Sequence, residues 1–163
     1  MDDPLLLIRV LLLLGIANGT PIFAKKLLND RFAAPLDGGL TLPDGRSLFG
    51  RSKTIRGLAV AIVCTALAAP LLGFGWALGA GLATASLVGD LASSFTKRRL
   101  GLAPHAQAFL LDQIPEALLP LLLFQAQLGL SALDIALLLA AFVGLEIVLS
   151  RLLFKLHIRD RPY

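Results

Sequence analysis

The chain has 163 residues, of which 56% are hydrophobic and only 16% are charged, and its mean hydropathy is +0.80. Soluble domains contain about 45–50% apolar and about 25% charged residues, so an ordinary soluble globule is excluded. Disorder is excluded because the net charge is only +4 in so apolar a chain, and the single Cys64 excludes a disulfide scaffold or a cysteine-ligated metal site. We therefore expect an all-α integral membrane protein, formed as one domain by residues 1–163.

Five segments are long and apolar enough, or nearly so, to cross the hydrocarbon core, which takes about 20 residues of helix. They are residues 4–17, 57–74, 76–95, 114–130 and 132–154. The first is the weakest, since it is short and carries Arg9, which either extends to the membrane surface or pairs with Glu146. A Gly-rich turn at 73–75 predicts a tight hairpin, and Pro115 and Pro120 predict a kinked fourth helix. The sequence thus predicts a bundle of about five transmembrane helices.

The positive charges indicate how this bundle is oriented. All but one of the 15 Lys and Arg residues lie in a long loop at 18–56, a loop at 97–112, or the tail from residue 151. Five spans place these three regions on one face, and the positive-inside rule assigns that face to the cytoplasm with the N-terminus outside. Without the first span, only the N-terminus would change sides. The pI of about 9.7 is therefore explained by basic residues that set the orientation of the protein in the membrane and bind an anionic ligand. No nucleic-acid partner is expected.

The loop at 18–56 is far longer than a usual connection, which predicts a function or a structure of its own. Asp-Gly steps at 37–38 and 44–45 are typical of tight turns and predict a small hairpin. Arg51, Lys53 and Arg56 then precede or begin a membrane helix, where cations and backbone N–H groups suit a phosphate. The alternative is that these cations only flank a span at the headgroup level.

The third predicted span ends in a polar motif. Asp90, Ser94 and Lys97 are spaced by four and three, so they lie on one helix face. An acidic residue at membrane depth is costly and should face the bundle interior or a wet cavity. Asp90 is then either a carboxylate beside a cation-bound phosphate or a structural partner of Lys97 or Ser94.

A second pair of acids, Asp112 and Glu116, lies at the start of the fourth predicted span. Mg²⁺ is often held by one or two carboxylates together with substrate phosphates, and the chain has neither Cys clusters nor paired His. The alternative is that both acids cap the helix and favour its dipole. Glu146, a lone acid in the last span, is a weaker candidate and could pair with Arg151.

Together these motifs resemble the membrane phosphatidate cytidylyltransferases, and more closely the CDP-archaeol synthase family and its bacterial relatives. The core of the likeness is Gly89-Asp90-Leu91 followed by Ser94 and Lys97-Arg98. Further matching segments are Asn18-Gly19-Thr20-Pro21, Asp37-Gly38-Gly39, Leu48-Phe49-Gly50, Lys53-Thr54-Ile55-Arg56-Gly57, residues 94–101 and Asp112-Gln113. The likeness covers most of residues 15–116, and we expect the chain to be a bacterial relative.

The resemblance implies transfer of a cytidylyl group from CTP to a membrane lipid phosphate monoester, giving a CDP-activated lipid and pyrophosphate, with Mg²⁺ as cofactor. It assigns Asp90 and Asp112 to the metal, and Lys97 to the catalytic centre with them. It assigns nucleotide and lipid phosphates to Lys53, Arg56, Lys97 and Arg98, and polar substrate contacts to Asn18, Thr54, Ser94 and Gln113. The residue chemistry agrees, because cations and a metal offset the repulsion between anionic reactants.

The chain departs from the family pattern at two places. Leu102-Ala103-Pro104 stands where the cytidylyltransferases have a Lys-Asp pair, and Pro115 stands where the family has a second aspartate. We hypothesise that Glu116 replaces this aspartate as a metal ligand. The alternatives are a non-catalytic lipid-phosphate or nucleotide-binding membrane protein, or a small transporter using its intramembrane acids. Small residues at 75, 79, 81 and 83 pack helices within the chain or in a homodimer.

Overall fold

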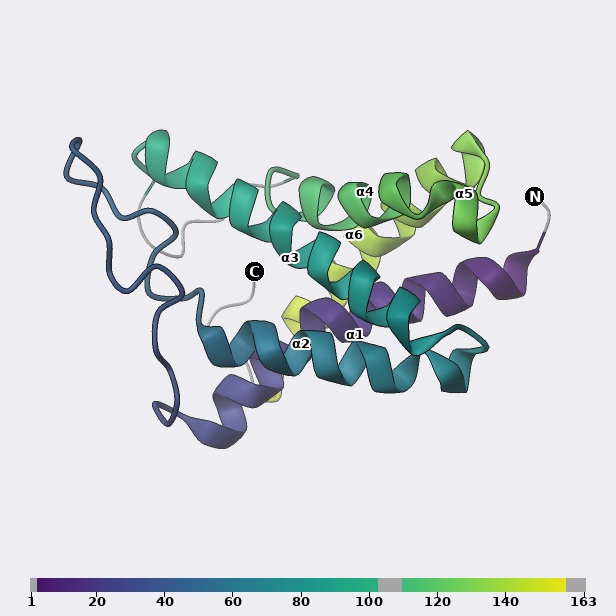
Figure 1. Ribbon diagram of the computed structural model, residues 1–163, viewed down its shortest axis with the longest axis horizontal. Helices are drawn as coiled ribbons and strands as arrows, with labels where there is room; N and C mark the ends of the chain where they lie inside the picture. The colour runs from purple at the N-terminus through teal and green to yellow at the C-terminus, as the bar shows by residue number, and fades with distance from the viewer. Residues whose placement is uncertain (1–2, 103–109, 158–163) are drawn as a thin grey trace.

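The computed structural model describes residues 3–102 and 110–157, and these form the predicted all-α membrane protein (Figure 1). The elements are α1 (Pro4–Leu28), α2 (Ile55–Ala68), the 3₁₀ turn η1 (Pro70–Leu72), α3 (Trp76–Arg99), α4 (Gln113–Leu123), α5 (Gln125–Leu128) and α6 (Ala132–Lys155). Within the described ranges, α1, α2 with η1, α3 and α6 are long and apolar enough to cross a membrane, and α4 is a shorter apolar helix. The chain is therefore a multi-pass integral membrane protein.

Helix α1 is longer than the predicted first span. It begins where Asp3 accepts a hydrogen bond from the Leu5 N–H, with Pro4 in the first turn, and it continues to Leu28. Residues 18–28, predicted to lie in the loop, are therefore helical. Gly19, Thr20 and Pro21 are weak helix formers, but Ala17 and Ala24, seven residues apart, are both buried on this helix. Packing outweighs local preference here, and the long loop covers only residues 29–54.

The fourth predicted span is divided. Helix α4 has 11 residues, which at about 1.5 Å per residue is close to half of the roughly 30 Å hydrocarbon thickness. Pro120 lies inside α4 without ending it, and the interruption falls at Phe124, before the short α5. The Phe124 ring lies against Gly81 of α3, where an added Cβ would approach it to 2.6 Å. The predicted kink is thus a break, fixed by a packed aromatic side chain.

Small residues bring the helices together inside the chain. A Cβ added to Gly79 would lie 2.6 Å from the Thr65 carbonyl oxygen, so α3 packs directly on α2 there. The core combines Val10, Leu13, Leu14, Leu82, Leu121 and Leu138, from α1, α3, α4 and α6. Gly79 and Gly81 are therefore used within the chain, and a homodimer stays a prediction without support from these two glycines.

The two ends of the bundle differ in charge. The N-terminus, the turn before α3 and α5 lie at one end in Figure 1, and loop 29–54 and the end of α3 lie at the other. Arg9 lies beside the turn at Gly73, so its side chain reaches the end opposite the cationic loops. The predicted loop segment 103–109 and the tail cations Arg159 and Arg161 fall outside the described residues. Which end faces the cytoplasm stays a prediction.

Candidate active site

The site is built where α3 and the start of α4 cross in close contact. A Cβ added to Gly89 would lie 2.1 Å from the Pro115 carbonyl oxygen and 2.8 Å from the Glu116 nitrogen. Only glycine admits a backbone this near to α3. The crossing brings Asp90, next to Gly89, beside the first turn of α4, which begins at Gln113 with Asp112 at its N-cap position. Pro115 lies in this first turn, where its missing N–H costs little.

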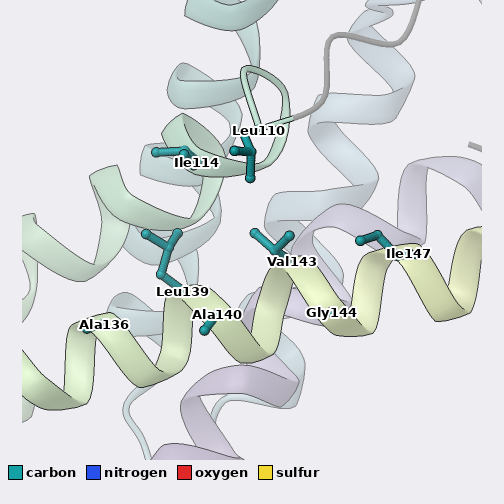
Figure 2. Close-up of a pocket in the computed structure, with 8 residues that line it drawn as sticks. All are labelled: Leu110, Ile114, Ala136, Leu139, Ala140, Val143, Gly144 and Ile147. Atoms are coloured by element: carbon teal, nitrogen blue, oxygen red, sulfur yellow. The ribbon is translucent and has the colours of Figure 1, made fainter.

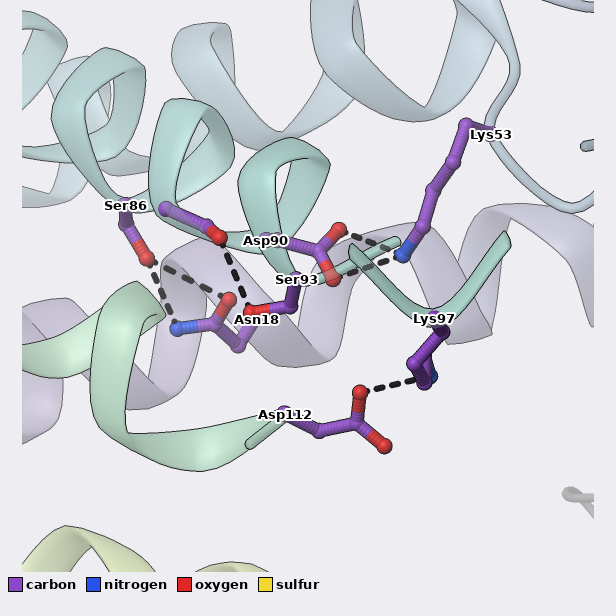
Figure 3. Close-up of polar contacts among 8 residues, drawn as sticks. Asn18, Lys53, Ser86, Asp90, Ser93, Lys97 and Asp112 are labelled. Atoms are coloured by element: carbon purple, nitrogen blue, oxygen red, sulfur yellow. Dashed lines mark hydrogen bonds and ion pairs between the residues drawn. The ribbon is translucent and has the colours of Figure 1, made fainter. Parts of the chain in front are cut away.

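Two acid–lysine pairs occupy the crossing (Figure 3). The Lys53 ammonium donates to both oxygens of Asp90, at 2.7 and 2.5 Å, and the Lys97 ammonium lies 2.5 Å from an oxygen of Asp112. All four side chains are largely buried, with 13–23% of each exposed. Three separate stretches of sequence thus meet, and Asp90 and Lys97 of α3 each have a partner of opposite charge. The alternative that Asp90 pairs with Lys97 or Ser94 is wrong, because Lys53 holds it.

Lys53 reaches Asp90 because the long loop is folded. The Asp37 carboxylate accepts hydrogen bonds from the N–H groups of Gly39, Phe49 and Gly50, at 2.9–3.1 Å. Partial burial raises the pKa of Asp37, but these three backbone donors outweigh it and hold the pKa below the usual value. The bridge between Thr41 and Ser47 forms the predicted hairpin. This compact loop delivers Lys53 to the crossing.

A second set of contacts fastens the hairpin to the end of α3. Arg99 Nη1 lies 2.5 Å from the Asp44 carboxylate, and its Nη2 donates to the Ser47 carbonyl at 2.8 Å. Arg46 in turn donates to the Arg98 and Arg99 carbonyls at the helix C-terminus. The backbone N–H of Arg46 and the Arg99 side chain lower the pKa of Asp44. The loop that carries Lys53 is therefore anchored to the helix that carries Asp90.

The remaining predicted site residues fall into three groups. The Asn18 amide donates a hydrogen bond to the Ser86 hydroxyl, which in turn donates to the Asn18 amide oxygen (Figure 3). Ser86 lies one turn before Asp90 on the same face of α3, so Asn18 belongs to the site. Thr54 caps α2 by accepting from Gly57, and Arg56 donates to the carbonyls of Asn29 and Arg31, so both hold the loop ends. Ser94 and Arg98 of α3 and Gln113 of α4 are buried.

Glu116, the hypothesised replacement acid, lies one turn after Asp112 at the start of α4. It is almost fully buried, and its charged neighbours are Glu146 of α6, Asp90 and Lys53. Glu146, the weaker candidate in the sequence analysis, thus lies next to Glu116. Its position in an apolar run gave no signal for this partner, because the contact depends on how α6 packs against α4.

The donors present fit a magnesium ion that is shared with a substrate. Among residues 3–102 and 110–157, no three His, Cys, Asp or Glu side chains are arranged to hold a metal, so Asp90, Asp112 and Glu116 do not form a ready three-ligand cage. Two carboxylates at one crossing, with lysines beside them, match Mg²⁺ that is held by one or two carboxylates and by phosphate oxygens. The donor set therefore fits the ion only together with an anionic ligand.

This fold and site define a multi-pass membrane protein with a charged intramembrane site suited to a phosphate ligand. Residues 72–163 match a family model described as CarS-like: CDP-archaeol synthase. CDP-archaeol synthase from Pyrobaculum calidifontis is 36% identical over 156 residues, with 91% of each chain covered, and that from Aeropyrum pernix is 40% identical over 124 residues, covering 70% of this chain and 66% of the relative. The chain therefore belongs to the CDP-archaeol synthase family.

A solved structure supports the fold as well. It is described as an intramembrane enzyme for archaeal membrane lipids biosynthesis, and it matches with a TM-score of 0.69 and 34% identity, covering 86% of this chain and 90% of its own. The resemblance seen in the sequence motifs is thus confirmed. The relatives reported are archaeal, so the expectation of a bacterial relative finds no support.

Proposed function

We propose that the chain transfers a cytidylyl group from CTP to a lipid phosphate in the membrane, using the crossing of α3 and α4 as its active site. Membership of the family supports CTP-dependent cytidylyl transfer. The observation that carries the assignment of the site is the pair of acid–lysine contacts, Lys53 with Asp90 and Lys97 with Asp112. These are the side chains needed to bind two phosphate-bearing substrates and a metal.

The reaction needs no covalent protein intermediate. A lipid phosphate oxygen attacks the α-phosphorus of CTP, the new O–P bond forms, and the bond to the β-phosphate breaks to release pyrophosphate. Lys53 and Lys97 turn from their carboxylates toward the phosphates and offset their negative charge. Asp90 and Asp112 would then hold Mg²⁺, which neutralises and orients the triphosphate. Asn18 of α1, which is hydrogen-bonded to Ser86 one turn before Asp90, supplies an amide that can fix a substrate oxygen.

The lipid substrate is proposed from the relatives' name. A CDP-archaeol synthase produces a CDP-activated ether lipid, so we propose an archaeal ether-lipid phosphate as the substrate of this chain. Phosphatidic acid carries the same phosphate monoester on ester-linked chains. The crossing of α3 and α4 recognises the shared phosphate, and the two lipids form separate arms of the test. The positive-inside rule supports placing this end of the bundle in the cytoplasm, where CTP is found.

The test is Mg²⁺-dependent incorporation of labelled CTP into an organic-extractable product by the purified protein, with each lipid phosphate in turn. Asp112→Asn should abolish turnover and leave the detergent-solubilised protein folded. Asp30→Asn, at an exposed loop carboxylate, is the matched control and should retain full activity. Turnover in Asp112→Asn above about a tenth of the unmutated rate would contradict the metal assignment. CTP binding without turnover on any lipid phosphate would support the non-catalytic alternative.

A further inference from the structure

Two large apolar side chains are exposed at the charged end of the bundle. Leu27, in the last turn of α1, and Phe32, in the turn that follows, are each 79% exposed. The apolar groove of about 520 Å³ between α4 and α6 is lined by other residues, so neither side chain belongs to it (Figure 2). Apolar surface is unfavourable in water, and the depth of these two residues in the membrane determines what covers them.

The start of α2 fixes the depth of this segment. Helix α2 together with η1 has 18 residues, about 27 Å at 1.5 Å per residue, which only just spans the roughly 30 Å hydrocarbon core. Ile55, the first residue of α2, therefore lies at the boundary between hydrocarbon and headgroups. Its N–H donates to the Ala34 carbonyl at 3.1 Å, and Pro35 pairs with Thr54. The segment directly after Phe32 thus lies at the same depth.

Arg56 holds the segment before Phe32 at this depth too. Its guanidinium donates to the Asn29 carbonyl at 2.8 Å and to the Arg31 carbonyl. Phe32 has a φ of +58°, a left-handed conformation that a bulky residue seldom adopts. The chain is therefore held at the membrane boundary on both sides of Phe32, while the ring itself stays exposed.

The hairpin of the same loop lies farther from the hydrocarbon. Arg99 and Asp44 fasten it to the end of α3, and α3 has 24 residues. At 1.5 Å per residue this helix is about 36 Å long, so it extends about 6 Å beyond the hydrocarbon core. Leu40, in this hairpin, is 54% exposed. The long loop thus has one part at the membrane boundary and another part in water.

We infer that residues 27–34 form an interfacial anchor, which inserts Leu27 and Phe32 between the headgroups and the first acyl-chain carbons of the bilayer. Leu and Phe beside basic residues are typical of segments that lie in this layer. Lys26 and Arg31 are exposed next to the two apolar side chains, and their charge complements the headgroups of anionic lipids. The partner of this surface is therefore the lipid bilayer.

The anchor affects the active site because Lys53 is tied to it. The Lys53 carbonyl accepts a hydrogen bond from the Leu36 N–H at 2.8 Å, while its ammonium holds Asp90. An anchored segment keeps Lys53 level with the phosphate of a lipid in the same leaflet, a consequence that rests on the proposed function. Phe32 is then a positioning residue, which acts on the lipid substrate through Lys53.

The first test measures the depth of the anchor and needs no turnover. Trp76, the only tryptophan of the chain, is replaced in a Trp76→Phe background, into which Phe32→Trp is introduced. In vesicles of phosphatidylcholine and phosphatidylglycerol, the new tryptophan should emit at short wavelength and lose most of its intensity when the acyl chains are brominated near the headgroup. Leu27→Trp should behave in the same way, and Leu40→Trp, the matched control, should emit at long wavelength without quenching.

Unquenched emission from both Phe32→Trp and Leu27→Trp would overturn the inference. At long wavelength it would place the segment in water, and at short wavelength it would show that protein covers it, as in a second copy.

The second test measures the effect on the substrate. Phe32→Ser should raise the KM for a lipid phosphate in vesicles about ten-fold, the loss expected when roughly half of a phenylalanine side chain no longer buries, and should change the KM for CTP much less. Phe32→Trp should keep the original KM, as should Leu40→Ser. An unchanged KM in Phe32→Ser would overturn the positioning role. Quenching of Phe32→Trp in a protein that gives no CTP-dependent product would retain the anchor and refute the proposed function.

Discussion

Gly89→Ala tests whether the close crossing of α3 and α4 positions the active site. The added Cβ would lie 2.1 Å from the Pro115 carbonyl oxygen, and it would also meet the Pro115 carbonyl carbon at 2.5 Å. Both are backbone atoms, so no side-chain rotation relieves the contact. Bringing the closest approach to 3.0 Å, below which real Cβ contacts hardly occur, requires the helices to separate by about 1 Å. Asp112 moves with α4, away from Asp90 and Lys53.

A displacement of this size should have a large effect on turnover. Misplacing reacting groups by about 1 Å can cost on the order of 100-fold in rate, and overpacking a core typically costs about 1–3 kcal/mol of stability. We therefore expect Gly89→Ala to lower kcat/KM for CTP about 100-fold, measured by labelled CTP incorporation, while the variant remains folded by thermal unfolding in detergent.

The control is another helical glycine. Gly15 has no atom within 4 Å of an added Cβ, and alanine favours a helix by about 1 kcal/mol over glycine. Gly15→Ala should therefore keep its activity and be at least as stable as the unmutated protein. Gly89→Ala with more than half of the original kcat/KM, in a folded protein, would refute the view that this crossing sets the geometry of the site.

Three further predictions concern the charges. Asp90→Asn should abolish turnover and lower stability by about 2 kcal/mol, since the ammonium of Lys53 loses a charged partner; unchanged CTP incorporation would contradict this. Asp44→Asn should loosen the hairpin from Arg99, seen as faster hydrogen exchange at residues 40–48 and a higher KM for CTP with kcat less affected; unchanged exchange would show that the ion pair does not anchor the loop. The fold lowers the pKa of Asp37, so its contribution to loop stability is complete above the unfolded value near 3.8. That contribution is lost as the pH falls through the lower folded value. Loop amides that already lose protection, relative to their intrinsic exchange rates, as the pH is lowered to 5 would contradict this sign.

Much of the helical framework could be predicted because membrane spans leave a strong composition signal. The exceptions are instructive. Residues 18–28 were predicted as loop because Gly19 and Pro21 disfavour helix locally, yet buried Ala17 and Ala24 keep α1 helical. The break in the fourth span was expected at a proline and occurs at Phe124, whose ring packs on Gly81. Both differences arise from tertiary contacts that local sequence does not record.

The site could be predicted as a set of residues but not as a set of pairs. Spacing along one helix correctly placed Asp90 and Lys97 on one face of α3, two turns apart. It could not show that Lys53 arrives from a folded loop, or that Lys97 is directed to Asp112 across a helix crossing. Thr54 and Arg56 match the family motif, but in this structure they hold the ends of the loop. Motif membership identified the neighbourhood, and packing decided each contact.

The acid–lysine pairs also explain how a charged site is tolerated in an apolar bundle. An isolated charge at membrane depth costs several kcal/mol, at least about 2.5 for Asp or Lys at a helix centre, and two acids side by side would repel. Pairing each acid with a lysine leaves these two pairs neutral before substrate binds. Breaking these pairs is unfavourable unless both partners find new ones, and a metal with a phosphate supplies both. CTP alone would leave Asp90 and Asp112 facing added negative charge, and Mg²⁺ alone would leave the two lysines beside added positive charge. The site should therefore bind the two together, so the affinity for CTP should rise with Mg²⁺ and that for Mg²⁺ should rise equally with CTP.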